Sequence, residues 1–213
     1  MFTGIVSGIG RVVNVDPGNS GLRIVVDLCI DKTSFDYSSV SVGDSLCVSG
    51  VCLTVESVAG SKFSFYVSKE TLSLTCGLDT LGALVNLEPS LKVSSLLGGH
   101  FMYGHVDCVG SIVGWSLVGD STEMVVSIPI LFAPHIARKC SIAVNGISLT
   151  VNAVYDGVGY VRFSVNLIPY TLSHTMAHCL SLSSSVNIEV DMMSRYVLRC
   201  TEVFLNNSRN NGD

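Results

Sequence analysis

Two stretches of the chain carry small polar side chains at the same spacing. Residues 50–55 read Gly-Val-Cys-Leu-Thr-Val, and residues 146–151 read Gly-Ile-Ser-Leu-Thr-Val. Because alternate side chains of a strand point to opposite faces, the thiol or hydroxyl group shares a face with the threonine two positions later. A serine lies at the matching place in each preceding strand. These groups are Ser45, Cys52 and Thr54 in the first half, and Ser141, Ser148 and Thr150 in the second. Each half therefore offers hydrogen-bonding groups to the same kind of polar ligand.

The stretch that opens the second half contains two histidines. Residues 98–107 read Gly-Gly-His-Phe-Met-Tyr-Gly-His-Val-Asp. His100 and His105 would face opposite sides of an extended segment, so they are poor partners for one metal ion. The counterpart of His105 in the first half is Ile5. Histidine suits proton transfer near neutral pH, which makes His105 a candidate acid or base; the alternative is a structural histidine bonded to a backbone carbonyl.

Charged side chains also distinguish the second half. Lys139 comes just before the second polar strand pair, and Asp191 ends the last strand, where the first half has Ser90. The two form either an ordinary solvated pair, worth under about 1 kcal/mol, or a cation and an anion at the mouth of a ligand site. His174 and His178 have the spacing of one helix face, and without a third ligand we expect an ordinary helix surface.

The composition and the absence of common motifs exclude several classes of protein. A net charge of -5 and the lack of a basic run argue against a nucleic-acid binder. The start of the chain lacks the features of a secretory signal, and the longest apolar stretch, near residues 124–134, is shorter than the roughly 20 residues of a membrane-spanning helix. We therefore expect a cytoplasmic protein without a membrane partner. We find no phosphate-binding loop, dinucleotide fingerprint, nucleophile elbow or glycosidase-like carboxylate pair.

The eight cysteines predict no metal site. None forms a Cys-x-x-Cys pair, which disfavours zinc and dithiol redox motifs. Most lie in apolar surroundings and are expected to be reduced and buried. Cys52 differs, because it lies on the polar face of its strand.

The two polar strands belong to a tandem duplication, which also predicts the fold. Residues 4–10, 70–72 and 85–88 match residues 104–110, 170–172 and 186–189 in the same order. Each half consists mainly of short β-branched or aromatic segments separated by turns, and five or six such strands in about 90 residues suit a small closed barrel. The expected strands include 24–26, 45–48, 52–58 and 63–67, then 123–128, 141–144, 148–154 and 161–165. Short helices are expected at 69–75 and 169–178, the second with Pro169 in its first turn.

The segment after Asp191 has the pattern of an amphipathic helix. Met193, Val197, Cys200 and Phe204 recur at heptad-like spacing. Such a seam packs either against identical helices or against the chain's own barrel. We expect residues 206–213 to be disordered. The predicted domains are a first barrel at 1–92, a second barrel at 93–191, and a C-terminal helix and tail at 192–213.

These residues resemble the trimeric type of riboflavin synthase. The resemblance rests on Met-Phe-Thr-Gly-Ile-Val at 1–6, Gly-Gly-His-Phe and Gly-His-Val-Asp within 98–107, the paired polar strands, and Asn-Ile-Glu-Val-Asp at 187–191. It covers about residues 1–200. Two positions depart from the family pattern: Ser49 replaces an asparagine, which Asn145 keeps in the second half, and Tyr103 is bulkier than expected.

The resemblance implies a fold, a reaction and an assembly. The fold is all-β, with two tandem homologous six-stranded Greek-key β-barrels, short helices and a C-terminal oligomerisation helix. The reaction is a dismutation of two molecules of 6,7-dimethyl-8-ribityllumazine, in which a four-carbon unit passes from one to the other without a metal or separate cofactor. The products are riboflavin and 5-amino-6-ribitylamino-pyrimidinedione. The partners implied are two further copies of the chain, and a larger assembly with lumazine synthase is left open.

The resemblance also assigns site residues, one by one. The catalytic set is His105, Ser148, Thr150, Cys52, Asp191 and Lys139. The substrate-binding set is Ser45, Thr54, Gly4, Val6, Gly104, Val106, Lys69, Glu70, Thr71, Ser141, Ile168 and Thr171. Which barrel holds the donor lumazine, and which group removes the methyl proton, stay open.

Two other functions remain to be weighed against this enzyme. One is a non-catalytic lumazine- or flavin-binding protein, in which only one barrel keeps a working site. Here the second barrel keeps its polar groups, which favours the enzyme; they are His105, Lys139, Ser148, Thr150 and Asp191. The other is a purely structural barrel oligomer, which leaves the repeated polar faces unexplained.

Overall fold

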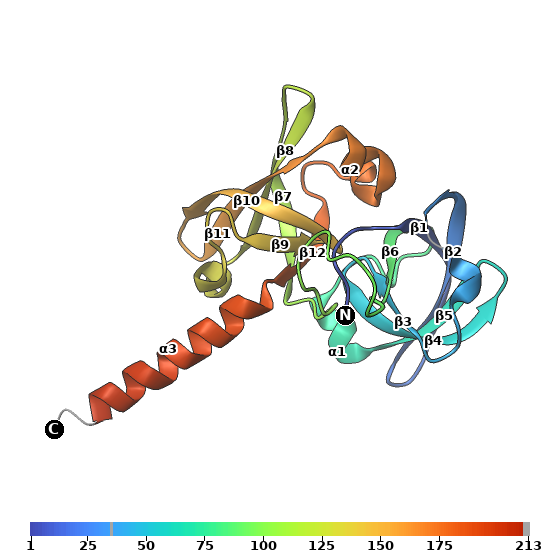
Figure 1. The fold of residues 1–213 in the computed structure, drawn as a ribbon, viewed down its shortest axis with the longest axis horizontal. Coiled ribbons are helices and arrows are strands. Elements are labelled where there is room, and N and C mark those ends of the chain that lie inside the picture. Colours follow the sequence, from blue (N-terminus) through green and yellow to red (C-terminus); the bar gives the residue numbers. More distant parts are fainter. Residues whose placement is uncertain (35, 211–213) are drawn as a thin grey trace.

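The chain folds into two closed β-barrels (Figure 1), as the duplication predicted. The computed structural model describes residues 1–34 and 36–210. Neighbouring strands in both barrels are antiparallel, and the strands of the first close in the order β1-β2-β5-β4-β3-β6. They are β1 (Gly8–Pro17), β2 (Gly21–Thr33), β3 (Ser45–Val48), β4 (Val51–Ala59), β5 (Lys62–Ser68) and β6 (Leu84–Pro89).

The second barrel repeats this topology. Its strands close in the order β7-β8-β11-β10-β9-β12, which is the first order with each strand replaced by its counterpart. They are β7 (Cys108–Val118), β8 (Ser121–Pro129), β9 (Ser141–Val144), β10 (Ile147–Asp156), β11 (Tyr160–Leu167) and β12 (Ser185–Val190). The predicted fold class is confirmed.

Alternation along the strands fills each barrel and leaves the polar face outside. Val51, Leu53 and Val55 of β4 are buried in the first barrel's core, whereas Thr54 is exposed. Strand β10 does the same, with its apolar residues in the second core and Thr150 exposed. The polar groups identified from the sequence therefore lie on the outer faces of the two barrels.

Short helices follow the fifth strand of each barrel. They are α1 (Lys69–Leu74) and α2 (Pro169–His174), and 3-10 turns occur at η1 (Tyr37–Ser39), η2 (Ile130–His135) and η3 (Met176–Cys179). The expectation of one helix over 169–178 is wrong. Thr175 is extended, and its hydroxyl accepts a hydrogen bond from the Ala177 N–H that opens η3. His174 and His178 therefore do not share a helix face, and the described residues contain no cluster of three metal-ligating side chains.

The last helix, α3 (Met192–Asn210), extends away from both barrels (Figure 1). It includes residues 206–210, which we expected to be disordered, while residues 211–213 lie outside the described part. Met193, Val197 and Phe204 are 70%, 64% and 70% exposed, so the chain's own barrel leaves most of the seam uncovered. At the root of the helix Arg195 pairs with the buried carboxylate of Asp107. No helix among residues 1–34 and 36–210 is long and apolar enough to cross a membrane.

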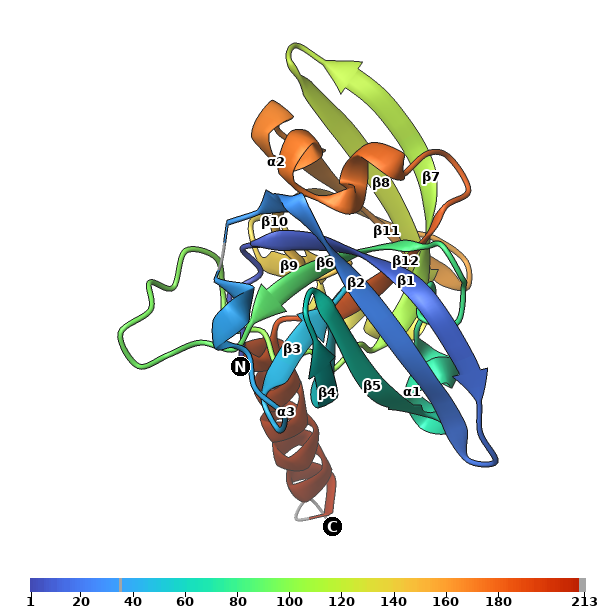
Figure 2. The same cartoon turned by 90° about the vertical axis from the view of Figure 1, so that its right-hand side faces the viewer.

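The opening segments of the two barrels are exchanged. The first opening segment (residues 1–7) and the second (residues 100–107) pair at Phe2 and Met102. Beyond this bridge each crosses to the other barrel, so that Val6 packs on the second core and Val106 on the first. Segment 90–99, which connects the halves, forms an outward loop (Figure 2). Each barrel's outer polar face is thus completed by the other barrel's opening segment.

The polar hairpins meet at the junction between the barrels. The turns of β3–β4 and β9–β10 place Ser49 and Asn145 at φ of 44° and 46°, so serine at the first position leaves this turn unchanged. The Ser49 hydroxyl accepts a hydrogen bond from Asn86 N–H (3.1 Å), as the Asn145 side chain does from Asn187 N–H (2.7 Å). The side-chain amide of Asn187 in turn donates to the carbonyl of Ser49 across the junction (2.9 Å). This last bond joins the two barrels, whereas the first two lie within one barrel each.

Candidate functional site

A cavity of about 230 Å³ lies on the first barrel, between β4, α1 and the second opening segment. Six predicted site residues line it together with three that were not predicted. The predicted ones are Cys52, Glu70, Thr71, Gly104, His105 and Val106, and the others are Val51, Leu74 and Thr75. Ser45 and Thr54 lie opposite each other on the same outer face of β3 and β4. The cavity therefore combines a thiol, hydroxyls, a carboxylate and an imidazole.

Close backbone contact holds the second opening segment against β4. The Cys52 N–H donates to the carbonyl of Gly104 (2.9 Å). Gly104 has a φ of +74°, and a Cβ at this position would lie 2.5 Å from the Cys52 nitrogen. Only glycine fits here, because a side chain would clash with the strand and would disfavour the left-handed backbone. His105 follows directly and is exposed at the cavity.

This position corrects one expectation. We expected His105 to serve the second half of the chain, because it stands in that half of the sequence. It lies instead beside Cys52 of the first barrel, and its counterpart Ile5 belongs to the segment that reaches the second barrel. The histidine therefore adds a titratable group to the first barrel's pocket.

Two buried glutamates anchor the opening segments. The Glu189 carboxylate accepts hydrogen bonds from the N–H groups of Tyr103 (2.7 Å) and His105 (2.9 Å). Glu88 does the same for Thr3 (2.7 Å) and Gly4 (2.9 Å). Burial raises the pKa of both carboxyl groups, although the backbone hydrogen bonds act in the opposite direction. Glu189 thus fixes the backbone from which the His105 side chain projects.

Helix α1 forms one wall of the cavity. The Ser68 hydroxyl caps its N-terminus by accepting a hydrogen bond from the Thr71 N–H (3.1 Å), and Glu70 lies in its first turn. Thr75 then donates its hydroxyl to the Thr71 carbonyl (2.8 Å). These local bonds present Glu70 and Thr71 toward the cavity, whereas Lys69 is exposed and does not line it.

The second barrel shows the corresponding arrangement around Ser148. The Ser148 N–H donates to the carbonyl of Gly4 (2.9 Å), in parallel with Cys52 and Gly104. Ser141 and Thr150 lie opposite each other beside it. In contrast to Cys52, Ser148 has a buried partner, because a hydrogen bond of 2.7 Å joins its Oγ to His100 Nδ1. Burial lowers the pKa of His100, with a smaller opposite effect from Asp191.

We expect His100 to make the protein less stable on acidification. In the folded state the imidazole stays neutral at pH values where the unfolded chain already binds a proton, since burial lowers its pKa from 6.5. Its contribution to the free energy of unfolding is therefore present above pH 6.5 and is lost as pH falls toward the folded-state pKa. The slope is at most about 1.4 kcal/mol per pH unit. Urea unfolding between about pH 5 and 7 should show this slope in the wild type and a smaller one in His100→Asn. Equal slopes in the two proteins would show that His100 does not cause this pH dependence.

The remaining predicted residues of the second half do not converge on one cavity. Lys139 is exposed, and the ion pairs of the described chain do not join it to Asp191. Asp191 accepts a hydrogen bond from the Met193 N–H (2.9 Å) and lines a groove at the root of α3. Ile168 precedes α2 and is exposed, while Thr171 lies within α2 and accepts the Thr175 hydroxyl. In a single chain, Lys139, Thr150 and Ile168 of the second barrel are therefore exposed.

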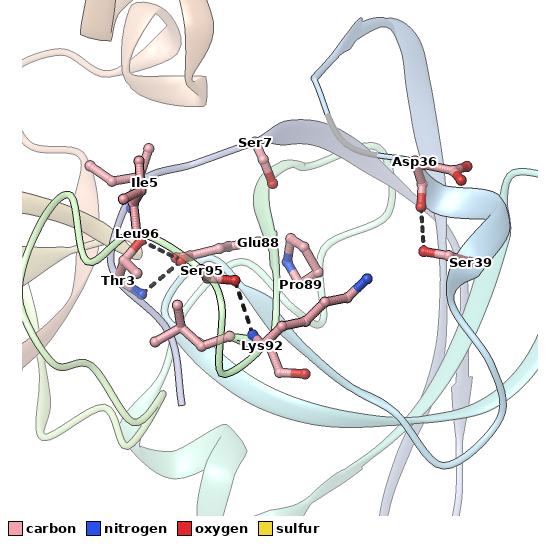
Figure 3. A pocket seen from close by; sticks show the side chains of 12 residues that line it. Thr3, Ile5, Ser7, Asp36, Ser39, Glu88, Pro89, Lys92, Ser95 and Leu96 are labelled. Atoms are coloured by element: carbon pink, nitrogen blue, oxygen red, sulfur yellow. Dashed lines mark hydrogen bonds between the residues drawn. The ribbon is translucent and has the colours of Figure 1, made fainter.

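Another cavity, of about 370 Å³, lies between the first opening segment, η1 and the loop after β6 (Figure 3). It contains none of the site residues predicted from the sequence. Its buried carboxylate, Glu88, already binds Thr3 through both its N–H and its hydroxyl (each 2.7 Å). We therefore assign no ligand to this cavity.

Sequence reasoning missed three polar residues that support the site. They are His100, which bonds Ser148, and the two anchors Glu88 and Glu189. The repeated Val-Asn-Leu-Glu and Val-Asn-Ile-Glu segments contained a usable signal, because both place polar residues within an apolar strand. In the structure Asn86, Glu88, Asn187 and Glu189 are all buried and hydrogen-bonded.

Comparisons with known proteins agree with this architecture. The model of the lumazine binding domain family matches twice, at residues 3–90 and 103–191. The riboflavin synthase of Brucella abortus is 38% identical over 208 residues, covering 95% of this chain and 98% of that protein. The riboflavin synthase of Photobacterium leiognathi is 35% identical over 204 residues, covering 95% and 90%. The crystal structure of LumP complexed with 6,7-dimethyl-8-(1'-D-ribityl) lumazine has a TM-score of 0.76 at 23% identity, covering 90% of this chain and 99% of that chain, and supports the fold alone.

Proposed function

The chain belongs to the riboflavin synthase family, and on this premise we propose that it is a transferase acting on two molecules of 6,7-dimethyl-8-ribityllumazine. One lumazine donates a four-carbon unit to the other, which gives riboflavin and 5-amino-6-ribitylamino-pyrimidinedione. The observation that carries the proposal is the cavity that brings Cys52, Thr71 and His105 together from three separate elements. The reaction needs no metal or separate cofactor.

The geometry suits this chemistry. The electron-poor lumazine ring already acidifies its 7-methyl group, so a modest base such as His105 and donors near the developing negative charge are sufficient. The Cys52 thiol and the Thr71 hydroxyl supply such donors in the first cavity. On the second barrel, we propose that Ser148 and Thr150 bind the other lumazine, with Asp191 and Lys139 at its edge. Holding two rings together supplies a large part of the acceleration.

We propose that the second barrel of one chain faces the first barrel of a neighbour in a homotrimer. Two observations support this: Lys139, Thr150 and Ile168 of the second barrel are exposed in the single chain, and so is the apolar seam of α3. Sedimentation of the wild type should give three copies, and a double change of Val197 and Phe204 to glutamate should give one. Glu202→Gln, on the exposed polar side of α3, is the matched control. An unchanged mass in the double variant would refute this assembly.

The enzymatic function is tested directly by incubating the purified chain with lumazine. One riboflavin should form for every two lumazines consumed, measured by absorbance and chromatography. Tight binding without product would favour the alternative of a non-catalytic lumazine-binding protein, which the two matches to the lumazine binding domain family also fit. We also propose a cytoplasmic location. Lumazine synthase is a further proposed partner, and co-sedimentation of the two proteins tests it.

We expect Cys52→Ser to have a mild effect. Serine keeps a hydrogen-bond donor of similar size at the same place, and the second barrel already has Ser148 at the matching position. The value of kcat should fall by less than about tenfold, which corresponds to the net value of one hydrogen bond. Steady-state kinetics with lumazine measure this, and a loss as large as that of a His105 variant would contradict a donor role for Cys52.

A further inference from the structure

Cys52 has a second thiol directly across the β3–β4 hairpin. The strand register pairs Cys52 with Cys47, one step beyond the pair that closes the two-residue turn. The Cys52 N–H is bonded to the Gly104 carbonyl and not to Cys47. Cys47 and Cys52 therefore form a non-hydrogen-bonded pair. In such pairs the two side chains share one face and the Cα atoms lie about 4.5 Å apart. Disulfides span Cα separations of about 4.4–6.8 Å, so this pair lies within reach of a disulfide.

The two thiols differ in access. Cys52 is half-buried and lines the cavity that also contains His105. Cys47 is 2% exposed and lies in an apolar cluster with Phe2 and Met102, against which Cys52 also packs. Burial raises the pKa of the Cys47 thiol well above its ordinary value, and the nearby Glu88 and Glu189 add to this. A reagent in solution therefore meets Cys52 first, and Cys47 is accessible only to a group already attached to Cys52.

This pair is specific to the first barrel. At the matching place in the second barrel, Ser148 lies opposite Ala143, so neither thiol is present. The strand registers of the described chain place no other two cysteines opposite each other. The second hairpin is otherwise similar, so it is an internal reference that lacks both thiols.

We propose that Cys52 and Cys47 form a reversible modification site that reacts with low-molecular-mass disulfides such as glutathione disulfide. The Cys52 thiolate attacks one sulfur of the reagent, which forms a mixed disulfide and releases one thiol. Cys47, which lies opposite Cys52, then loses its proton and attacks the Cys52 sulfur, which forms the Cys47–Cys52 disulfide and releases the second thiol. The two protons lost by the cysteines end on the two released thiols. A dithiol reverses the exchange.

Closure of this disulfide withdraws the Cys52 thiol from the cavity wall. The disulfide itself goes beyond the proposed function, whereas its effect on turnover rests on it. Since small displacements in a reactive site cost up to about a hundredfold in rate, we expect oxidation to lower turnover by more than Cys52→Ser does. Addition of dithiothreitol should restore it.

Peptide mapping of the full-length chain tests the modification without reference to activity. Between Lys32 and Lys62 the sequence contains no lysine or arginine, so trypsin releases residues 33–62 with Cys47 and Cys52 as their only cysteines. After equilibration in glutathione buffers and blocking with N-ethylmaleimide, this peptide should lose two hydrogens and carry no maleimide under oxidising conditions. Under reducing conditions it should carry two maleimides.

The matched variant is Cys47→Ala, which copies Ala143 of the second barrel. It should keep activity in reducing buffer and should stop at one glutathione on Cys52 when oxidised, and Cys47→Ser serves if the alanine variant does not fold. Two maleimides on the wild-type peptide in oxidising buffer, while the exposed Cys179 and Cys200 have reacted, would overturn the proposal. A stable mixed disulfide on Cys52 in the wild type would overturn it as well. A chain that forms the disulfide but makes no riboflavin would instead refute the proposed function.

Discussion

Replacement of His105 by glutamine is expected to lower kcat for riboflavin formation by about a hundredfold or more, with a much smaller change in lumazine affinity. His105 lies beside Cys52 in the cavity of the first barrel and is exposed to a bound ligand. Glutamine has a similar reach and forms hydrogen bonds, but it cannot exchange a proton near neutral pH. General acid–base groups contribute about 10²–10⁴ to a rate, so the loss should appear in the chemical step.

Two measurements separate this chemical role from a binding role. Lumazine binding to the variant is measured by fluorescence titration, and kcat is measured at saturating substrate. His178→Gln is the matched control, because that histidine is also exposed but lies outside this cavity. Equal losses in binding and in kcat, or a control that loses as much activity, would count against acid–base catalysis by His105.

Replacement of Glu189 by glutamine is expected to reduce both stability and turnover. Glu189 is 4% exposed, and its two carboxylate oxygens accept hydrogen bonds from the N–H groups of Tyr103 and His105. An amide has only one acceptor oxygen, so its NH₂ group would face a backbone N–H and leave it unpaired. An unsatisfied buried donor costs about 1–3 kcal/mol, which urea unfolding should detect. Because the segment carries His105, kcat should fall by about tenfold or more.

The equivalent change at Glu88 separates the two effects. Glu88→Gln frees Thr3 and Gly4 of the first opening segment, at a comparable cost in stability, but leaves the anchor of His105 intact. Hydrogen exchange should increase at residues 103–105 in Glu189→Gln and at residues 3–4 in Glu88→Gln. If both variants lose the same stability and the same kcat, Glu189 does not act through His105.

The sequence alone determined the features that depend on neighbouring residues. Strict alternation of apolar and polar residues predicted β4 and β10, because a strand repeats every two residues. Pro169 marked the start of α2, because its fixed backbone angle suits a first helical turn. The ordered repeat predicted two similar barrels, and the closed strand orders confirm them. The end of α2 was missed, because Thr175 leaves the helix through a local side-chain bond that periodicity does not reveal.

Only the tertiary structure decided which side chains meet at the candidate sites. His100 reaches Ser148 over 48 positions of sequence, and Glu189 reaches the His105 backbone over 84. The exchange of the opening segments is the largest such case, since it moves His105 to Cys52 of the first barrel. The two halves are so similar that either opening segment suits either barrel in strand pattern and hydrophobicity. The choice is made by contacts between distant segments, namely the bridge from Phe2 to Met102 and the bonds of Gly4 and Gly104 to the opposite barrels. Local periodicity does not encode such contacts.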